Sequence, residues 1–156
     1  MRLAPSNGIP ARRYTPAMAV EPPAGEGMER LLALCRQLRE HCPWDREQTI
    51  EKVEALVREE AAEIQAAVAK GDFANLREEI GDVLFNLLLL VRIAEERGLF
   101  TWAEVVDGEV AKMIRRHTHV YGETPAATAD EAIARFNAAK AAERAGSAGA
   151  DRRKDT

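Results

Sequence analysis

The stretch EEAAEIQAAVAKGDFANLREEIGD, residues 59–82, decides the fold that the sequence predicts. It is typical of one helix that ends, a turn at Gly71-Asp72, and a second helix that begins. A turn this short is expected to pack the two helices antiparallel. Glu63 lies about eight residues before Gly71 and Glu79 about eight residues after it, so acids of both helices should fall at the same level of the pair.

Two pairs of acidic side chains interrupt the faces along which these helices should pack. The pairs are Glu60 and Glu63 in the first helix, and Glu79 and Asp82 in the second. Burying an ionised carboxylate is costly unless a cation or hydrogen bonds compensate it. Hard divalent cations prefer carboxylate and water oxygens. We therefore expect these four acids to bind Mg²⁺ or Mn²⁺, rather than to be solvated acids paired with Lys and Arg. Glu59, one step to the side, could hold a water beside the metal.

A di-iron carboxylate bundle is a second kind of metal site that such helices can build. It adds imidazole ligands through Glu-x-x-His pairs. The residues three positions before His41, His117 and His119 are Leu38, Ile114 and Arg116. None of them is acidic, so the sequence lacks the ligands that distinguish this class.

Basic side chains recur at helical spacing further along the chain. Lys112, Arg115, Arg116 and His119 form one stripe, opposite an apolar one. Such a stripe presents donors suited to phosphate oxygens, although alone it is more typical of a solvated helix face. Combined with a metal site, it favours a polyphosphate ligand whose charge is shared between metal and guanidinium. Trp44 could stack on a base; the alternative is that it closes a core.

Composition limits the class of protein. The 156 residues and 17.2 kDa suit one domain. With 46% hydrophobic, 31% charged and only 5% aromatic residues, the chain fits a helical bundle. The net charge of −4 argues against a general nucleic-acid binder. Two cysteines make no disulfide scaffold, which favours the cytoplasm, and no apolar run is long enough to cross a membrane.

Periodicity and punctuation divide the chain into an all-α domain at about 26–145 and two tails, 1–25 and 146–156, that are expected to be disordered. Five helices are predicted, at about 27–41, 50–70, 74–97, 102–120 and 128–144, with a turn at 42–45. Residues 87–91 are apolar on every side of their helix and must be covered on every side. We therefore expect a homo-oligomer, either a dimer or a tetramer, with this helix near the interface.

Several of these motifs together resemble a known family. EExxE at residues 59–63 followed by ExxD at 79–82 is similar to the signature of the all-α nucleoside triphosphate pyrophosphohydrolases. The segments CPWD at residues 42–45, with Gln48-Thr49, and KMIRRH at 112–117 resemble the MazG branch in particular. The resemblance covers about residues 28–143. Two departures are Thr118, where the family often has Pro, and Phe136, where it often has Trp.

The resemblance implies a four-helix-bundle-like MazG fold with an additional C-terminal helix. It also implies Mg²⁺-dependent hydrolysis of ribo- or deoxyribonucleoside triphosphates to the monophosphate and pyrophosphate, which clears unwanted nucleotides from the pool. The implied metal ligands are Glu60, Glu63, Glu79 and Asp82, with Glu59 and Glu60 as candidate catalytic residues. The implied substrate-binding residues are Lys112, Arg115, Arg116, Trp44 and Phe136. The alternative is a non-catalytic, regulatory nucleotide-binding module.

Overall fold

The computed structural model describes residues 21–151, with side chains to residue 145. The helices are α1 (Gly27–His41), α2 (Pro43–Arg46), α3 (Ile50–Lys70), α4 (Phe73–Glu96), α5 (Trp102–Arg116), α6 (Thr118–Tyr121) and α7 (Ala129–Asp151). No strand occurs within this range, so the all-α prediction is confirmed. None of these helices is both long and apolar enough to cross a lipid bilayer.

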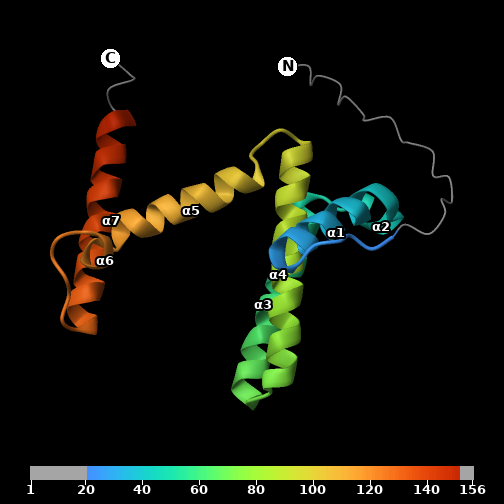
Figure 1. The fold of residues 1–156 in the computed structure, drawn as a ribbon, viewed down its shortest axis with the longest axis horizontal. Helices are drawn as coiled ribbons and strands as arrows, with labels where there is room; N and C mark the ends of the chain where they lie inside the picture. Colours follow the sequence, from blue (N-terminus) through green and yellow to red (C-terminus); the bar gives the residue numbers. More distant parts are fainter. Residues whose placement is uncertain (1–20, 152–156) are drawn as a thin grey trace, which may run out of the picture.

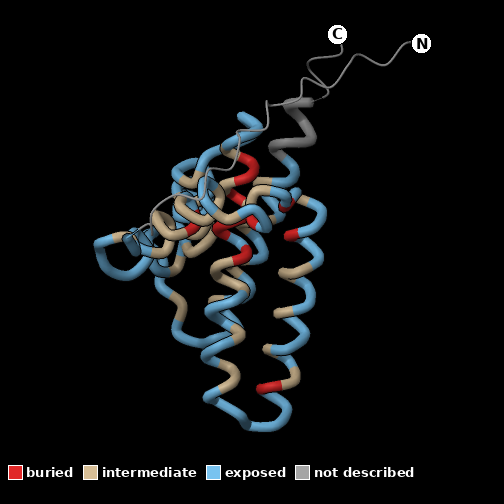
Figure 2. Tube along the Cα trace, turned by 90° about the vertical axis from the view of Figure 1, so that its right-hand side faces the viewer, coloured by how far each residue is buried: buried red, intermediate tan, exposed pale blue. Residues whose placement is uncertain are grey.

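Helices α3 and α4 form the antiparallel hairpin that the sequence predicts, and Figure 2 shows them side by side. Thr49 starts α3 by accepting a hydrogen bond from the Lys52 N–H. Gly71 ends α3 in the left-handed region at φ 69°, where a side chain would be strained. Asp72 then caps α4 by accepting from the Asn75 N–H. One residue thus ends the first helix and the next starts the second.

The hydrophobic core lies at the end of the hairpin that is remote from this turn (Figure 2). Cys35 of α1, Val53 of α3, and Leu88 and Leu89 of α4 are almost fully buried there. Nearer the turn the hairpin has less cover, and Ile80 is 51% exposed. The acidic pairs of the sequence therefore lie on the thinly covered half of the hairpin.

Helices α5, α6 and α7 form an arm that leaves the hairpin (Figure 1). Thr101 and Glu104 start α5 with a reciprocal capping box, as predicted. Within the described residues, α7 packs on α5 and α6, and α5 meets α4 near the connection between them. Apolar side chains of the arm consequently remain exposed in the single chain, among them Val110 at 51% and Ile133 at 58%.

Three predicted boundaries differ from the structure. The turn predicted at 42–45 is a short helix, α2, because Pro43 at its first position suits a helix start. The helix predicted to reach about residue 120 stops at Arg116, where His117 leaves helical geometry, and α6 follows. Helix α7 continues to Asp151, past the predicted end near residue 144. Residues 1–20 and 152–156 of the two predicted tails lie outside the described residues.

Candidate metal centre and basic cluster

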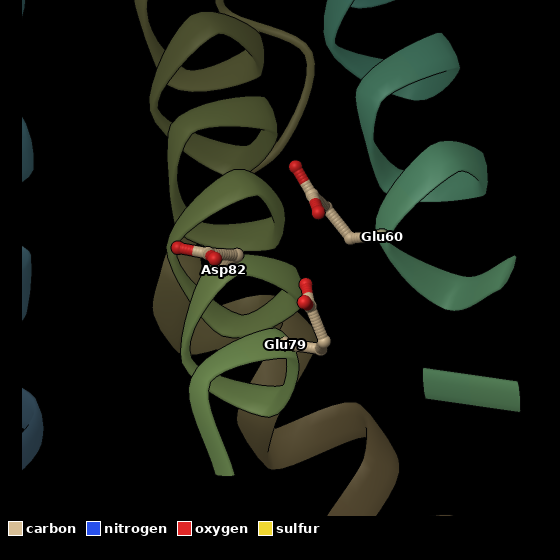
Figure 3. Close-up of side chains that lie close together, drawn as sticks. All are labelled: Glu60, Glu79 and Asp82. Carbon is tan, nitrogen blue, oxygen red and sulfur yellow. The ribbon is translucent and has the colours of Figure 1, made fainter. Parts of the chain in front are cut away.

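Three of the predicted metal ligands come together across the hairpin. Glu60 of α3 and Glu79 and Asp82 of α4 each offer a carboxylate oxygen, and these oxygens lie within 4.8 Å of one another. In Figure 3, Glu60 reaches from α3 toward the two acids of α4. Glu79 and Asp82 share a face because residues three apart in a helix are neighbours. We call these three residues the acidic group.

The acidic group forms no ion pair with a cation among the described side chains. Within residues 21–145, none of the ion pairs involves Glu60, Glu79 or Asp82. Desolvation raises the pKa of Glu60, and the negative charges of Asp82, Glu79 and Glu59 raise it further. An all-oxygen donor set with uncompensated negative charge fits a hard divalent cation such as Mg²⁺.

The acids of the motif differ in how far they are buried. Glu60 and Glu79 are half-buried, as expected for acids that face a neighbouring helix. Asp82 and Glu63 are exposed, and Glu63 is not one of the acidic group. Glu59 is exposed as well, but its charge acts on Glu60. Of the four acids predicted to face inward, Glu60 and Glu79 are thus half-buried and the other two are exposed, because α4 is the helix, among those described, that packs closely along α3.

The predicted basic stripe lies on the arm, where acids of the arm already pair with it. Arg115 Nε donates to Glu143 Oε1 at 3.1 Å. Arg116 Nε and Nη2 both lie 2.9 Å from Glu143 Oε2. Lys112 pairs with Glu109 on its own helix. Hydrogen bonds from Arg116, above all, lower the pKa of Glu143. We call Arg115, Arg116 and Glu143 the basic cluster.

Phe136 belongs to the packing of the same arm. The Arg116 guanidinium lies 5.8 Å from the centre of the Phe136 ring, a cation–π distance. The His117 ring meets Phe136 edge-on, with ring centres 5.2 Å apart. His119 lies 5.6 Å from His117 by the same measure. In the single chain, the ring of Phe136 therefore packs against protein groups on the arm.

Trp44 lies on α2, at the other side of the hairpin from α7 (Figure 1). The residue is 56% exposed, while side chains donate hydrogen bonds to the backbone around it. Gln48 Nε2 donates to the Trp44 carbonyl at 2.9 Å. Arg39 donates to the carbonyl of Asp45 and, at 3.3 Å, to that of Gln48. Trp44 is thus an exposed aromatic residue in a segment whose carbonyls accept hydrogen bonds from Arg39 and Gln48.

The acidic group and the basic cluster thus lie on separate parts of one chain. Within residues 21–151, α7 makes no contact with α3 or α4. Glu143 is not among the site residues predicted from the sequence, although it follows Phe136 by seven residues and so shares its face of α7. The spacing of seven residues indicates that Glu143 and Phe136 share a face of α7. It does not indicate which helix that face contacts.

Comparison with known proteins places the hairpin in a family. The family described as the MazG nucleotide pyrophosphohydrolase domain matches residues 48–121. The nucleoside triphosphate pyrophosphohydrolase of Escherichia coli K12 is 36% identical over 121 residues, which cover 76% of this chain and 46% of that protein. The nucleoside triphosphate pyrophosphohydrolase/pyrophosphatase MazG of Thermotoga maritima is 39% identical over 104 residues, covering 65% and 41%. This chain spans less than half the length of either relative.

A solved structure agrees with these sequence matches. The crystal structure of a mazG-related protein from Thermotoga maritima superposes with a TM-score of 0.65 at 30% identity, covering 72% of this chain and 98% of that one. The family match includes the acidic group and the basic side chains of α5, but neither Trp44 nor Glu143. From the matched residues, the shared identity and the shared fold, the chain belongs to the MazG nucleotide pyrophosphohydrolase family.

Proposed function

We propose that this chain hydrolyses nucleoside triphosphates, ribo or deoxy, to the nucleoside monophosphate and pyrophosphate, and so removes unwanted nucleotides from the pool. The observation that carries the proposal is the acidic group, three carboxylate oxygens within 4.8 Å of one another and without an ion pair to any side chain of residues 21–145. The similarity to proteins named nucleoside triphosphate pyrophosphohydrolase supports it. A cytoplasmic location belongs to the same proposal and is supported by two free thiols, Cys35 and Cys42.

In this proposal the acids of the hairpin hold Mg²⁺, with Mn²⁺ as a substitute. Glu60, Glu79 and Asp82 would supply oxygens to it, and Glu63, which is exposed on α3, would be the fourth ligand. When bound, the metal supplies charge neutralisation for the triphosphate and lowers the pKa of a bound water. Glu59, exposed beside Glu60, accepts a proton from the attacking water. Glu60 is the second residue that we propose for this catalytic role.

Basic and aromatic side chains position the substrate. Lys112, Arg115 and Arg116 bind phosphate oxygens, because guanidinium and ammonium donors stabilise negative charge there. Trp44 and Phe136 contact the base, for which a flat aromatic face suffices without hydrogen-bond readout.

We also propose that the protein is a homo-oligomer, a dimer or a tetramer. Exposed apolar side chains on α4 and on the arm support this, among them Ile80, Leu87 and Val110. A second copy would let the arm of one chain approach the hairpin of another. Light scattering coupled to size exclusion tests the assembly, and a monomer at micromolar concentration would contradict it.

The experiment that tests the activity is a panel of ribo- and deoxyribonucleoside triphosphates with Mg²⁺, scored for pyrophosphate against orthophosphate. We expect pyrophosphate as the product, and its release should stop in Glu79→Ala while the helical circular dichroism stays unchanged. Glu78→Ala, one position along α4 and outside the acidic group, is the matched control. Triphosphate binding without turnover in the unaltered protein would favour the regulatory, non-catalytic alternative.

A further inference from the structure

Glu143 of α7 joins the two arginines that end α5. Its Oε1 accepts from Arg115 Nε at 3.1 Å, and its Oε2 lies 2.9 Å from both Nε and Nη2 of Arg116. One carboxylate therefore holds both guanidinium groups, Arg115 at Oε1 and Arg116 at Oε2, through charge-assisted contacts. The family match ends at residue 121, before Glu143.

The two arginines differ in how far they are committed to the protein. The side chain of Arg116 is only 18% exposed, donates to Glu143 through Nε with Nη2 also 2.9 Å from Oε2, and lies over the Phe136 ring. The side chain of Arg115 is 59% exposed and meets Glu143 through Nε, next to the aliphatic part of the side chain. Glu143 thus holds Arg115 at Nε, while more than half of the Arg115 side chain is exposed to solvent.

We propose that Glu143 is a positioning residue for the triphosphate: it fixes Arg116 as a brace between α5 and α7 and directs Arg115 toward the phosphates. The proposal rests on the function proposed above and changes the division of labour within it. Arg115 becomes the residue that contacts phosphate, and Arg116 acts by holding the arm together.

The physical reason is the conformational freedom of arginine. A long side chain that is free in the unbound protein must be ordered when phosphate binds, and this ordering weakens the affinity. A carboxylate that has already restrained the chain at Nε removes part of this loss. If Glu143 acts in this way, its effect on binding must pass through Arg115, so the two residues must be coupled.

A double-mutant cycle measures this coupling. Glu143→Gln, Arg115→Ala and the double variant are compared with the unaltered protein, both in KM and kcat with a nucleoside triphosphate and in the calorimetric Kd of inorganic triphosphate with Mg²⁺. We expect Glu143→Gln to raise KM and Kd about tenfold with kcat nearly unchanged, because one lost restraint is of this order. In the Arg115→Ala background, Glu143→Gln should add less than about twofold. Asp130→Asn, an exposed acid in the first turn of α7, is the control and should leave both constants unchanged.

The outcomes separate this inference from the proposed function. Independent, additive effects of the two substitutions would overturn it, as would tighter triphosphate binding in Glu143→Gln, which would make Glu143 a competitor of phosphate. Weakened binding in Arg115→Ala with no effect of Glu143→Gln would overturn the inference and leave the proposed function standing. If the unaltered protein hydrolyses no triphosphate, the proposed function fails, while the calorimetric cycle still decides the role of Glu143.

Discussion

Replacing Glu60 with Gln should make the metal-free protein more stable and the magnesium-loaded protein less stable than the unaltered one. Glu60 is half-buried, and its pKa is raised by desolvation and then by the charges of Asp82 and Glu79. A carboxyl whose pKa is raised by folding stabilises the protein when protonated, below its unfolded pKa, and this contribution is lost as the pH rises through the folded pKa. At pH 7 the ionised group therefore opposes folding, and removing its charge should help.

The magnitude follows from the geometry of the acidic group. Oxygens within 4.8 Å of one another repel by about 0.9 kcal/mol for each charged pair in water. The water value is the appropriate one because Asp82 is exposed. Glu60→Gln removes two such pairs, so we expect a gain of about 1 to 2 kcal/mol, or several degrees in Tm for a domain of this size.

The assay is thermal unfolding followed by circular dichroism at pH 7, in chelator and in excess Mg²⁺. A ligand at a hundred times its Kd stabilises the folded state by about 2.7 kcal/mol, so the unaltered protein should gain stability with Mg²⁺. Glu60→Gln has lost a charged ligand and should gain much less, which reverses the order of the two melting temperatures. Glu78→Gln, which lies on α4 outside the acidic group, should follow the unaltered protein in both conditions.

Two results, if both are obtained, would refute the repulsion among the acids and the metal site at Glu60. The first is a Glu60→Gln variant that melts at or below the unaltered protein in chelator, which would mean that the acids do not repel one another. The second is an Mg²⁺-induced rise in Tm of the same size in both proteins, which would place the metal elsewhere.

Three further predictions concern the same domain. The Mg²⁺-induced rise in Tm should shrink as the pH falls, because protons compete with the metal for the carboxylates. The raised pKa of Glu60 brings this competition to a higher pH than for an ordinary Glu. A rise in Tm that does not depend on pH would argue against Glu60 as a ligand. Arg39→Ala should lower the free energy of unfolding, measured in urea, by about 2 to 3 kcal/mol. The substitution removes the donor that joins α1 to Glu96 of α4 and to the carbonyls of Asp45 and Gln48. A loss within measurement error would show that these hydrogen bonds do not stabilise the fold. Burial raises the pKa of the Cys35 thiol to about 11. At pH 8 a disulfide reagent should therefore label Cys42 and reach Cys35 only when the protein unfolds. Equal labelling rates of the two thiols in the folded protein would contradict the buried position of Cys35.

The sequence by itself determined the helices of the hairpin and the residues of the acidic group. Apolar spacing along a helix reports which side chains share a face, and Gly71 and Asp72 mark the turn by local backbone chemistry. The facing acids followed from this, because a short antiparallel turn fixes the register of the two helices. Glu60, Glu79 and Asp82 accordingly lie together as predicted, although Glu63 does not join them.

Only the tertiary structure decided how the arm lies and what its charges contact. The packing of α7 on α5 and α6 and the pairing of Glu143 with both arginines join residues far apart in the sequence. Periodicity identifies the face of a helix but not the helix that covers it, since that choice depends on packing among all the elements. The distance between the basic cluster and the acidic group is a property of this packing, and for that reason spacing alone could not supply it.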